Sequence, residues 1–164
     1  MFTTAESRPG RAWQDVYVDD ADVVRAWLRA GNESDIDAAV GLIDPEFEMF
    51  EAASLPGAAH VCGEEQLRSY FHGWRRNWSE WDWREEEIVE VPPDRVVLMA
   101  TLWLRGLRSG LAVQHRWAYV FTIRHGRLLR QDGYETKEEA LTAVGLLQGS
   151  EHERQPAAAD ESEK

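Results

Sequence analysis

The chain has 164 residues, of which 43% are hydrophobic and 29% charged, and this predicts one soluble globular domain with a core of its own. A net charge of −12 without a basic cluster excludes a nucleic-acid-binding face and argues against docking on an anionic membrane. The chain has no apolar run of membrane-spanning length, no signal-like N-terminus and a single cysteine, Cys62, so we expect a cytoplasmic protein without a disulfide framework.

Composition divides the chain into three segments. Residues 1–19 mix turn-forming residues with a few apolar ones, and we expect a loose N-terminal segment. Residues 20–147 carry the periodic apolar patterns of a folded domain. Residues 148–164 lack such patterns, which predicts a disordered acidic tail.

Two helices open the predicted domain. Between Asp20 and Ala30 the apolar side chains fall on one helical stripe, and Gly31-Asn32 supplies a stop signal. Ser34, with Asp37 three residues later, fits a capping box for a second helix. That helix is expected to end at Asp44-Pro45, because the residue before a proline disfavours helical geometry.

A short strand over residues 47–51, a loop over 52–62 and a third helix over 63–78 are predicted next. This helix carries one apolar, aromatic-rich face. Its members are Leu67, Tyr70, Phe71, Trp74 and Trp78.

Strands dominate the second half of the chain. His125-Gly126 predicts a tight hairpin turn before the last strand, and Thr136 with Glu139 forms a capping box for a final helix over 137–147. Helices followed by a run of antiparallel strands predict an α+β fold. The expected strands are 81–91, 96–107, 111–124 and 127–134.

Six short phrases stand between or at the ends of these elements. They are Asn32–Ile36, Ile43–Pro45, Cys62–Glu65, Ser109-Gly110, Val120–Arg127 and Tyr134–Leu141. In this order they resemble the SnoaL-like branch of the NTF2-like superfamily over residues 20–147. The resemblance implies a cone, in which a strongly curved antiparallel sheet wraps around a helix, with a pocket at the open end. It also implies pairing of two copies through the outer face of the sheet.

The superfamily includes isomerases, hydrolases, polyketide cyclases and non-enzymatic domains, so the site must be argued residue by residue. Laid on the ketosteroid isomerase pattern, the resemblance puts Trp27 at the donor position and Ala118 at the oxyanion acid. Phe50 falls at the position of the base, or Glu51 if the loop is shifted by one residue. Because Phe50 and Ala118 cannot move protons, the isomerase mechanism is disfavoured.

Other branches of the superfamily leave further catalytic candidates. Arg116 and Asp132 match a fragment of the aspartate–arginine–aspartate set of limonene epoxide hydrolase. His115 and Asp132 are the nearest match to the acidic residue and histidine of the cyclases. The catalytic residues are therefore left open, with Glu51, Arg116 and Asp132 as candidates.

Strand alternation places His115 and Arg116 on opposite faces of one strand. We assign the small-residue face of Arg116 to the pocket and the aromatic face to a homodimer contact. In the last strand, the resemblance turns Gln131 inward, whereas simple alternation from Leu128 turns Asp132 inward, and both remain open. The predicted dimer contacts are Trp117, Tyr119 and Phe121. The predicted ligand contacts are Trp27, Phe50, Met99, Thr101, Trp103, Arg116, Ala118 and Gln131.

Several of these residues have a packing alternative. Four tryptophans, at 74, 78, 81 and 83, could form a platform for a cofactor or a sugar, but we favour simple packing on a helix stripe and one strand face. An inward Arg116 would need a partner, and we favour an ion pair with a carboxylate such as Glu48 or Glu51 over a ligand contact. Cys62 has no evident histidine partner and is expected to be inert. The single cysteine argues against a cysteine-based zinc site, and the histidines lack metal-ligand spacing, so no metal site is expected.

Two functions from different classes follow. In the first, a small-molecule partner, largely apolar and organic, is held in the cone and undergoes cofactor-free isomerisation, cyclisation or hydration chemistry. In the second, the chain is a non-catalytic binding or dimeric assembly module of the same fold. An inward carboxylate or histidine with a strongly perturbed pKa would favour the enzyme.

Overall fold

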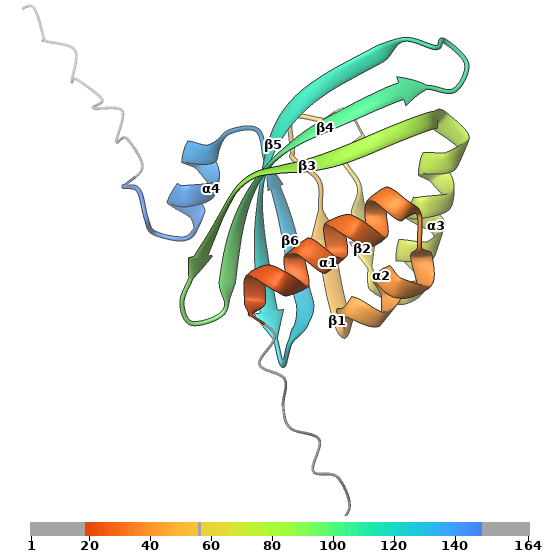
Figure 1. Cartoon of the computed structure of the whole chain (residues 1–164). Coiled ribbons are helices and arrows are strands. Elements are labelled where there is room, and N and C mark those ends of the chain that lie inside the picture. The colour runs from red at the N-terminus through yellow and green to blue at the C-terminus, as the bar shows by residue number, and fades with distance from the viewer. Residues whose placement is uncertain (1–18, 56, 149–164) are drawn as a thin grey trace, which may run out of the picture.

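The protein is described by a computed structural model that covers residues 19–55 and 57–148. Most of the predicted loose segment 1–19 and of the predicted tail 148–164 therefore lies outside the described residues. Three helices and two short strands precede a meander of four strands and a last helix (Figure 1). The six strands form one curved, open sheet in the order β2-β1-β6-β5-β4-β3, which confirms the α+β class.

Helix α1 (Asp20–Glu33) is longer than predicted, and the predicted cap of the next helix is wrong. Ser34 adopts a left-handed conformation (φ 56°) and donates its backbone N–H to the last turn of α1, so it closes that helix. Asp35 is then the residue that caps α2 (Ile36–Leu42), where its side chain accepts from the N–H of Ala38.

The segment after α2 is more extended than predicted. Strand β1 (Ile43–Phe50) begins directly at the end of α2, and it pairs parallel to the last strand β6. The expected loop ends in a short strand, β2 (His60–Cys62), which pairs antiparallel with β1. Helix α3 (Gly63–Asn77) follows and matches its prediction to within one residue.

The meander confirms the predicted strands and their turn. Strands β3 (Trp78–Val91), β4 (Arg95–Gly106), β5 (Ala112–Arg124) and β6 (Arg127–Tyr134) pair antiparallel in sequence order. His125 and Gly126 both have positive φ, as a type I′ hairpin turn requires. The Thr136–Glu139 capping box is present and opens α4 (Lys137–Ala143), which is shorter than expected.

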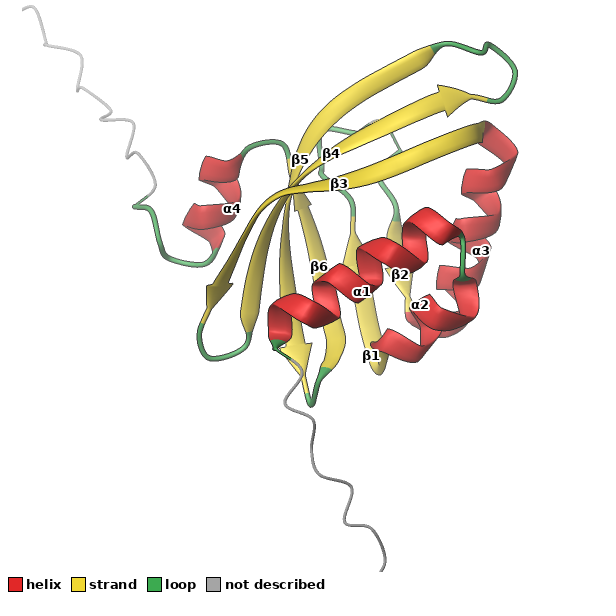
Figure 2. Cartoon of the chain, in the orientation of Figure 1, coloured by secondary structure: helices red, strands yellow, loops and turns green. Residues whose placement is uncertain are grey.

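Helices pack on both faces of the sheet. Helices α1, α2 and α3 lie on its concave side, whereas α4 lies on the other side, the convex side (Figure 2). The main core fills the concave side and contains Val24, Trp27, Phe47, Leu67 and Phe121. A smaller cluster packs Ala140 of α4 on Met99, Ala118 and Val120, so the two faces of β4 and β5 have different partners.

An ion pair ties the start of β1 to the end of β5. The guanidinium of Arg124 donates to both carboxylate oxygens of Asp44, at 3.1 and 2.7 Å, and also contacts Glu46. The Arg124 hydrogen bonds, followed by the N–H of Glu46, lower the pKa of the Asp44 carboxyl. This anchor keeps β1 aligned with the meander.

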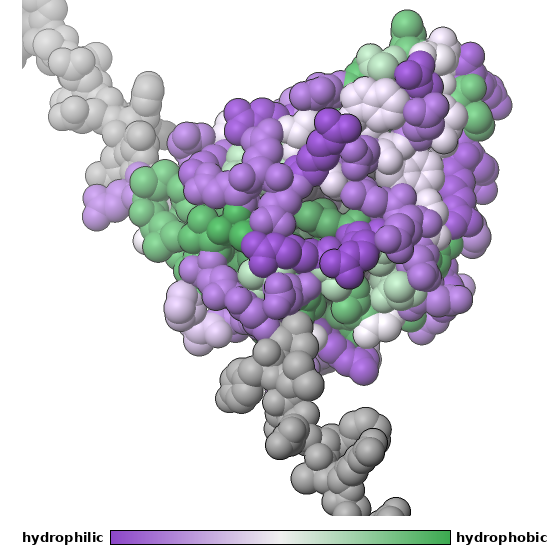
Figure 3. Space-filling view, viewed as in Figure 1, coloured by the Kyte–Doolittle hydropathy of each residue, from purple (hydrophilic) through white to green (hydrophobic). Residues whose placement is uncertain are grey.

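Hydrophilic side chains cover most of the surface seen in Figure 3, and a strip of apolar atoms extends from α4 toward the middle of the view. Exposed apolar side chains also gather at the tip of the β4–β5 hairpin, at Leu107, Leu111 and Val113. Across the described residues, none of the helices combines the length and apolar character needed to cross a bilayer.

Candidate functional site

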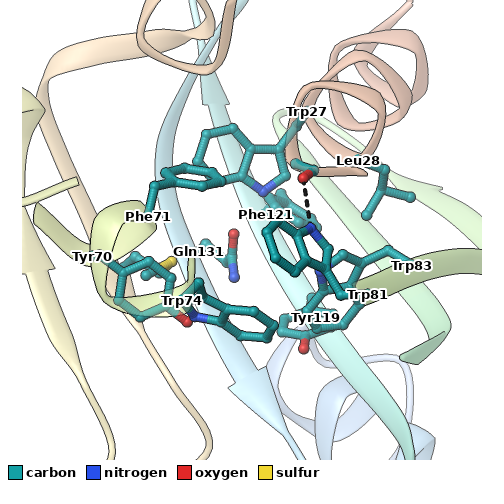
Figure 4. A pocket seen from close by; sticks show the side chains of 12 residues that line it. Trp27, Leu28, Tyr70, Phe71, Trp74, Trp81, Trp83, Tyr119, Phe121 and Gln131 are labelled. Carbon is teal, nitrogen blue, oxygen red and sulfur yellow. Dashed lines mark hydrogen bonds between the residues drawn. The ribbon is translucent and has the colours of Figure 1, made fainter. Parts of the chain in front are cut away.

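An aromatic cavity lies between the concave face of the sheet and helices α1 and α3 (Figure 4). We call it the inner chamber, and its cavity volume is about 70 Å³. The chamber is lined by Trp27, Leu28, Gly31, Met49, Tyr70, Phe71, Trp74, Trp81, Trp83, Tyr119, Phe121 and Gln131.

The local structure explains why so many rings converge. Tyr70 and Trp74 lie one turn apart on α3, so both project to the same side of that helix. Trp81 and Trp83 alternate on β3 and face the same side of the strand. The ring centroid of Trp74 lies 6.2 Å from that of Trp81 and 6.2 Å from that of Trp83, and the Trp83 centroid lies 5.5 Å from that of Tyr119. The indole N–H of Trp81 donates to the carbonyl of Gly31 at 2.9 Å, which fixes one wall to α1.

A second, wider space, which we call the mouth, adjoins the inner chamber. Its cavity volume is about 540 Å³. Apolar side chains from the loop and from β4 and β5 line it, together with His115 and Glu51. Five residues line both spaces and so mark the border between them: Tyr70, Trp74, Trp83, Tyr119 and Gln131.

The acidic side chain of Glu51 is held at this border. One carboxylate oxygen accepts the hydroxyl of Tyr70 at 2.5 Å. The other accepts the backbone N–H of Ala59 at 2.8 Å, while the N–H of Glu51 itself donates to the Ala59 carbonyl at 3.0 Å. The carboxylate therefore has a fixed position beside an apolar chamber, as a general base requires.

Two tyrosines near Glu51 stay protonated well above the pH at which tyrosine usually ionises. Burial is the main cause that raises the pKa of Tyr70, and the charge of Glu51 and the hydrogen bond to it add to the shift. Burial likewise raises the pKa of Tyr119, with smaller contributions from Tyr70 and Glu51. Both hydroxyls can therefore serve as hydrogen-bond donors at neutral pH.

The amide of Gln131 points into the space enclosed by the aromatic rings (Figure 4). The residue is 8% exposed, and its Oε1 is buried without a hydrogen-bond partner among the described residues. Leaving a buried acceptor unpaired costs about 1–3 kcal/mol. A bound molecule that carries a donor would recover part of that free energy.

A bulge in β6 decides the orientation that alternation left open. Ile123 pairs with Leu128, but Thr122 pairs with Arg130, so one extra residue is inserted at Leu129. Leu128 faces the core and Gln131, three residues later, faces the cavity. The inward position of Gln131 implied by the resemblance is confirmed.

Three of the predicted site residues lie at the cavity. Trp27 and Gln131 line the inner chamber, and Glu51 lines the mouth. Their contact with a ligand or a reacting atom remains a prediction.

The face of β5 assigned to the pocket is wrong. Ala118 is covered by α4 together with Met99, which explains why this face carries small residues. Arg116 lies on the same convex side, where its Nε donates to Glu86 at 2.8 Å. Arg116 thus forms an ion pair, but neither Glu48 nor Glu51 is its partner.

Thr101 and Trp103 share the convex face with Arg116. The hydroxyl of Thr101 donates to Glu86, and this bond, followed by the one from Arg116, lowers the pKa of the Glu86 carboxyl. The guanidinium of Arg105 lies over the Trp103 ring, with its Cζ atom 5.3 Å from the centroid of that ring. Trp103 also lines a separate polar hollow. None of these residues lines the aromatic cavity.

Phe50 and Asp132 also point away from the cavity. The Phe50 ring stacks on His60 with centroids 4.2 Å apart, and the Arg130 guanidinium lies 4.4 Å from its centroid on the convex side. Arg130 in turn donates to both oxygens of Asp132, at 2.7 and 2.8 Å. Asp132 is therefore paired outside the chamber, away from Glu51.

The predicted dimer contact cannot form through the residues chosen for it. Trp117 and Phe121 are 9% and 1% exposed, and Tyr119 lines both parts of the cavity. These rings fill the concave side because an aromatic strand face covers more apolar area than a small-residue face.

Sequence reasoning missed Tyr70 and Tyr119 as site residues and favoured packing for the tryptophan group. Trp74, Trp81 and Trp83 do pack on one another, yet they also line the inner chamber. The sequence did contain a sign of this arrangement. Trp74 belongs to an aromatic stripe on a helix and Trp81 and Trp83 share one face of a strand, so two aromatic walls could be expected to face one another.

The two buried tyrosines predict a specific alkaline behaviour. An unfolded chain loses tyrosine protons near pH 10, whereas folded Tyr70 and Tyr119 keep theirs. The unfolded state then binds fewer protons than the native state, so the free energy of unfolding falls as pH rises above about 10. A spectrophotometric phenolate titration should show that at least two of the four tyrosines ionise only as the circular dichroism signal of the fold is lost.

Phenylalanine variants of Tyr70 and Tyr119 should each make that alkaline loss of stability less steep. Ionisation of all four tyrosines in one step near pH 10, with the native circular dichroism retained, would contradict the buried environment described above.

Comparison with known proteins supplies a family and a fold. The model of the SnoaL-like domain family matches residues 24–131, whereas no curated protein sequence matches the chain significantly.

Solved structures match along most of the domain. An NTF2-like protein of unknown function from Burkholderia pseudomallei is 13% identical, with a TM-score of 0.65, over 76% of this chain and 96% of its own. A protein of ketosteroid isomerase-like fold from Catenulispora acidiphila, in complex with trimethylamine, is 16% identical with a TM-score of 0.63, over 77% and 94%. TerC co-crystallised with polyporic acid is 16% identical with a TM-score of 0.64, over 77% and 98%. At these identities the likeness shows the NTF2-like fold that these chains share.

Proposed function

The chain belongs to the SnoaL-like domain family, and from this premise we propose that it binds a small, flat, largely apolar organic molecule in the aromatic cavity and moves a proton on it without a cofactor. The observation that carries the proposal is the carboxylate of Glu51, fixed by Tyr70 and Ala59 at the border of the inner chamber. This placement supports isomerase, cyclase or hydratase chemistry.

The walls support the apolar part of the ligand. Ring faces and edges surround the chamber on several sides, and burial of apolar surface contributes about 25 cal/mol for each Å² removed from water. A two-ring ligand that buries about 200 Å² would gain about 5 kcal/mol before the entropic cost of binding. The walls are therefore suited to hold a molecule that offers few polar groups.

The border residues support the polar end of the ligand. The Gln131 amide and the Tyr119 hydroxyl are neutral groups that face the cavity near Glu51, and each can donate a hydrogen bond to a carbonyl oxygen. In the proposed step, Glu51 takes a proton from the carbon next to that carbonyl. The developing negative charge on the oxygen is then stabilised by these donors, and Glu51 returns the proton at another position.

Two of the similar structures are named with a small organic compound. Trimethylamine and polyporic acid, the compounds named with two of the neighbours, are both small organic molecules. For this chain we favour a neutral ligand that carries both a carbonyl group and a donor such as a hydroxyl, because the buried Gln131 Oε1 lacks a donor among the described residues, whereas the Gln131 amide and the Tyr119 hydroxyl can donate to a carbonyl oxygen.

Native mass spectrometry of the purified protein, followed by denaturation, tests the binding part. A retained small molecule would be released on denaturation, and its mass would restrict the ligand class. The same spectra report whether the chain forms a dimer. Because Trp117, Tyr119 and Phe121 lie on the concave side of the sheet, no contact surface is assigned to such a dimer.

Hydrogen–deuterium exchange of 2-tetralone in D₂O tests the chemical part. This ketone has a flat apolar body and an acidic C–H next to its carbonyl, and NMR reports the exchange directly. The protein should accelerate exchange, and Glu51→Gln should reduce the acceleration by about 10²–10⁴-fold, with a smaller loss in Tyr70→Phe. Glu65→Gln, which changes an exposed carboxylate on α3, is the matched control and should behave as the wild type.

Binding of 2-tetralone is measured separately by quenching of the tryptophan fluorescence. Saturable quenching in both the wild type and Glu51→Gln, without any acceleration of exchange in either, would overturn the proton-transfer proposal and favour the non-catalytic binding module.

A further inference from the structure

Three potential metal ligands meet on the convex side of the β1–β2 edge, away from the aromatic cavity. The Nε2 atom of His60 lies 3.2 Å from the Glu48 carboxylate and 3.2 Å from the Sγ of Cys62. The three ligand atoms all lie within 4.8 Å of one another. The prediction that Cys62 has no histidine partner is therefore wrong, because β2 was not foreseen and its pairing brings the two side chains together.

We propose that Glu48, His60 and Cys62 form a binding site for a borderline divalent cation such as Zn²⁺. Thiolate, imidazole and carboxylate are the side-chain ligands that zinc takes, at about 2.0–2.3 Å from the metal. Ligand atoms at such distances around a tetrahedral ion are separated by about 3–4 Å. Both contacts of His60 Nε2 lie in this range, at 3.2 Å, and all three ligand atoms lie within 4.8 Å of one another. Three protein ligands leave the fourth position for water.

The backbone holds the three side chains on one surface. Glu48 is directly opposite Cys62 in the β1–β2 ladder, and Phe50 is opposite His60. Alternation then places all four side chains on the same face of the two strands. Because the ladder fixes the Cα atoms, the site needs only small side-chain rotations to close around an ion.

Neighbouring groups orient the ligands. The imidazole of His60 stacks on Phe50 with an interplanar angle of 15°, and Phe50 is itself covered by Arg130. The backbone N–H of Cys62 donates to the side chain of Gln66 at 2.8 Å, whereas its Sγ makes no capping bond to α3. The sulfur is therefore free to bind a metal ion.

The charges in the site suit a divalent cation. A bound thiolate and the Glu48 carboxylate together neutralise two positive charges. The guanidinium of Arg130, which covers Phe50, is already paired with both oxygens of Asp132. Its repulsion of a bound ion is reduced accordingly.

The test uses Co²⁺ and Zn²⁺ as probes on the full chain under reducing conditions. Co²⁺ should produce a near-ultraviolet thiolate-to-metal charge-transfer band, which Zn²⁺ should then displace. Cys62 is the only cysteine of the 164 residues, so Cys62→Ser should abolish the band. His60→Gln and Glu48→Gln should each weaken Zn²⁺ affinity by more than about tenfold, since even the loss of an outer partner of a ligand costs 10–100-fold. His72→Gln, an exposed histidine on α3, is the matched control and should bind as the wild type.

A second readout is the rate at which the Cys62 thiol reacts with a disulfide reagent, which Zn²⁺ should slow at least tenfold in the wild type and not in His60→Gln. Absence of the band in the folded wild type would overturn the proposal, and so would a band or Zn²⁺ affinity that persists unchanged in Cys62→Ser. Circular dichroism of each variant ensures that the loss of binding is read on folded protein.

Discussion

Replacing Phe47 with alanine is expected to lower the free energy of unfolding by about 3–5 kcal/mol, as is typical for deletion of a buried aromatic ring. Phe47 is 1% exposed and lies in the main core. Its ring centroid is 5.7 Å from that of Trp27, so it supports α1 against β1. A cavity at this position would remove contacts from both elements at once. Urea unfolding, followed by circular dichroism, measures the change.

Two further variants make this result interpretable. Leu111→Ala removes a side chain that is 70% exposed and should change the free energy of unfolding by less than about 0.5 kcal/mol. If Phe47→Ala does not fold, Phe47→Leu keeps most of the volume and should still lose about 1 kcal/mol. A loss below 1 kcal/mol for the alanine variant would mean that α1 does not depend on this contact.

The elements that were predictable from the sequence are those whose signals are local. The Thr136–Glu139 capping box and the His125-Gly126 turn depend only on residues that are neighbours in the chain. The stripe of α1 that carries Val24 and Trp27 is likewise a property of one helix. For such features the physics that forms the structure acts within a few residues, so the pattern is sufficient.

The faces of the strands were not predictable in the same way. Alternation correctly separates Arg116 from Trp117, but it does not say which face is concave. Small residues such as Ala118 are compatible with a ligand pocket and equally with a helix packed on the sheet. The choice is made by α4, which reaches the convex face from the other end of the chain. A register shift in β6 at Leu129 also exchanges the inward and outward positions of the residues that follow it. A simple alternating pattern does not predict such a shift.

The candidate site was foreseen only in part for a related reason. Glu51 and Tyr70 are 19 residues apart, and their hydrogen bond depends on how α3 returns to the end of β1. Tyr70 could be assigned to an apolar helix face from its spacing, but its hydroxyl partner could not. The pairing of His60 with Cys62 across β2 is missed for the same reason, since the strand is only three residues long.

Gly133→Ala is expected to disturb both the fold and the site. A Cβ atom at this position would lie 2.8 Å from the backbone nitrogen of Ala52 and 3.3 Å from the carbonyl carbon of Glu51. Both contacts are with backbone, so β1 and β6 would have to separate. We expect a loss of about 1–3 kcal/mol in the free energy of unfolding, as for other overpacked positions.

The same displacement would carry the Glu51 carboxylate away from the Tyr70 hydroxyl. Exchange of 2-tetralone, if the protein accelerates it, should therefore fall in Gly133→Ala by more than the fraction of unfolded protein explains. Gly41→Ala is the matched control, because a Cβ there meets no atom within 4 Å and lies in α2, where alanine stabilises a helix by up to about 1 kcal/mol relative to glycine. Unchanged stability in Gly133→Ala would show that β1 and β6 lie farther apart than described. In that case the position of Glu51 at the border of the chamber would lose its structural basis, since the close approach of these two strands is what places its backbone there.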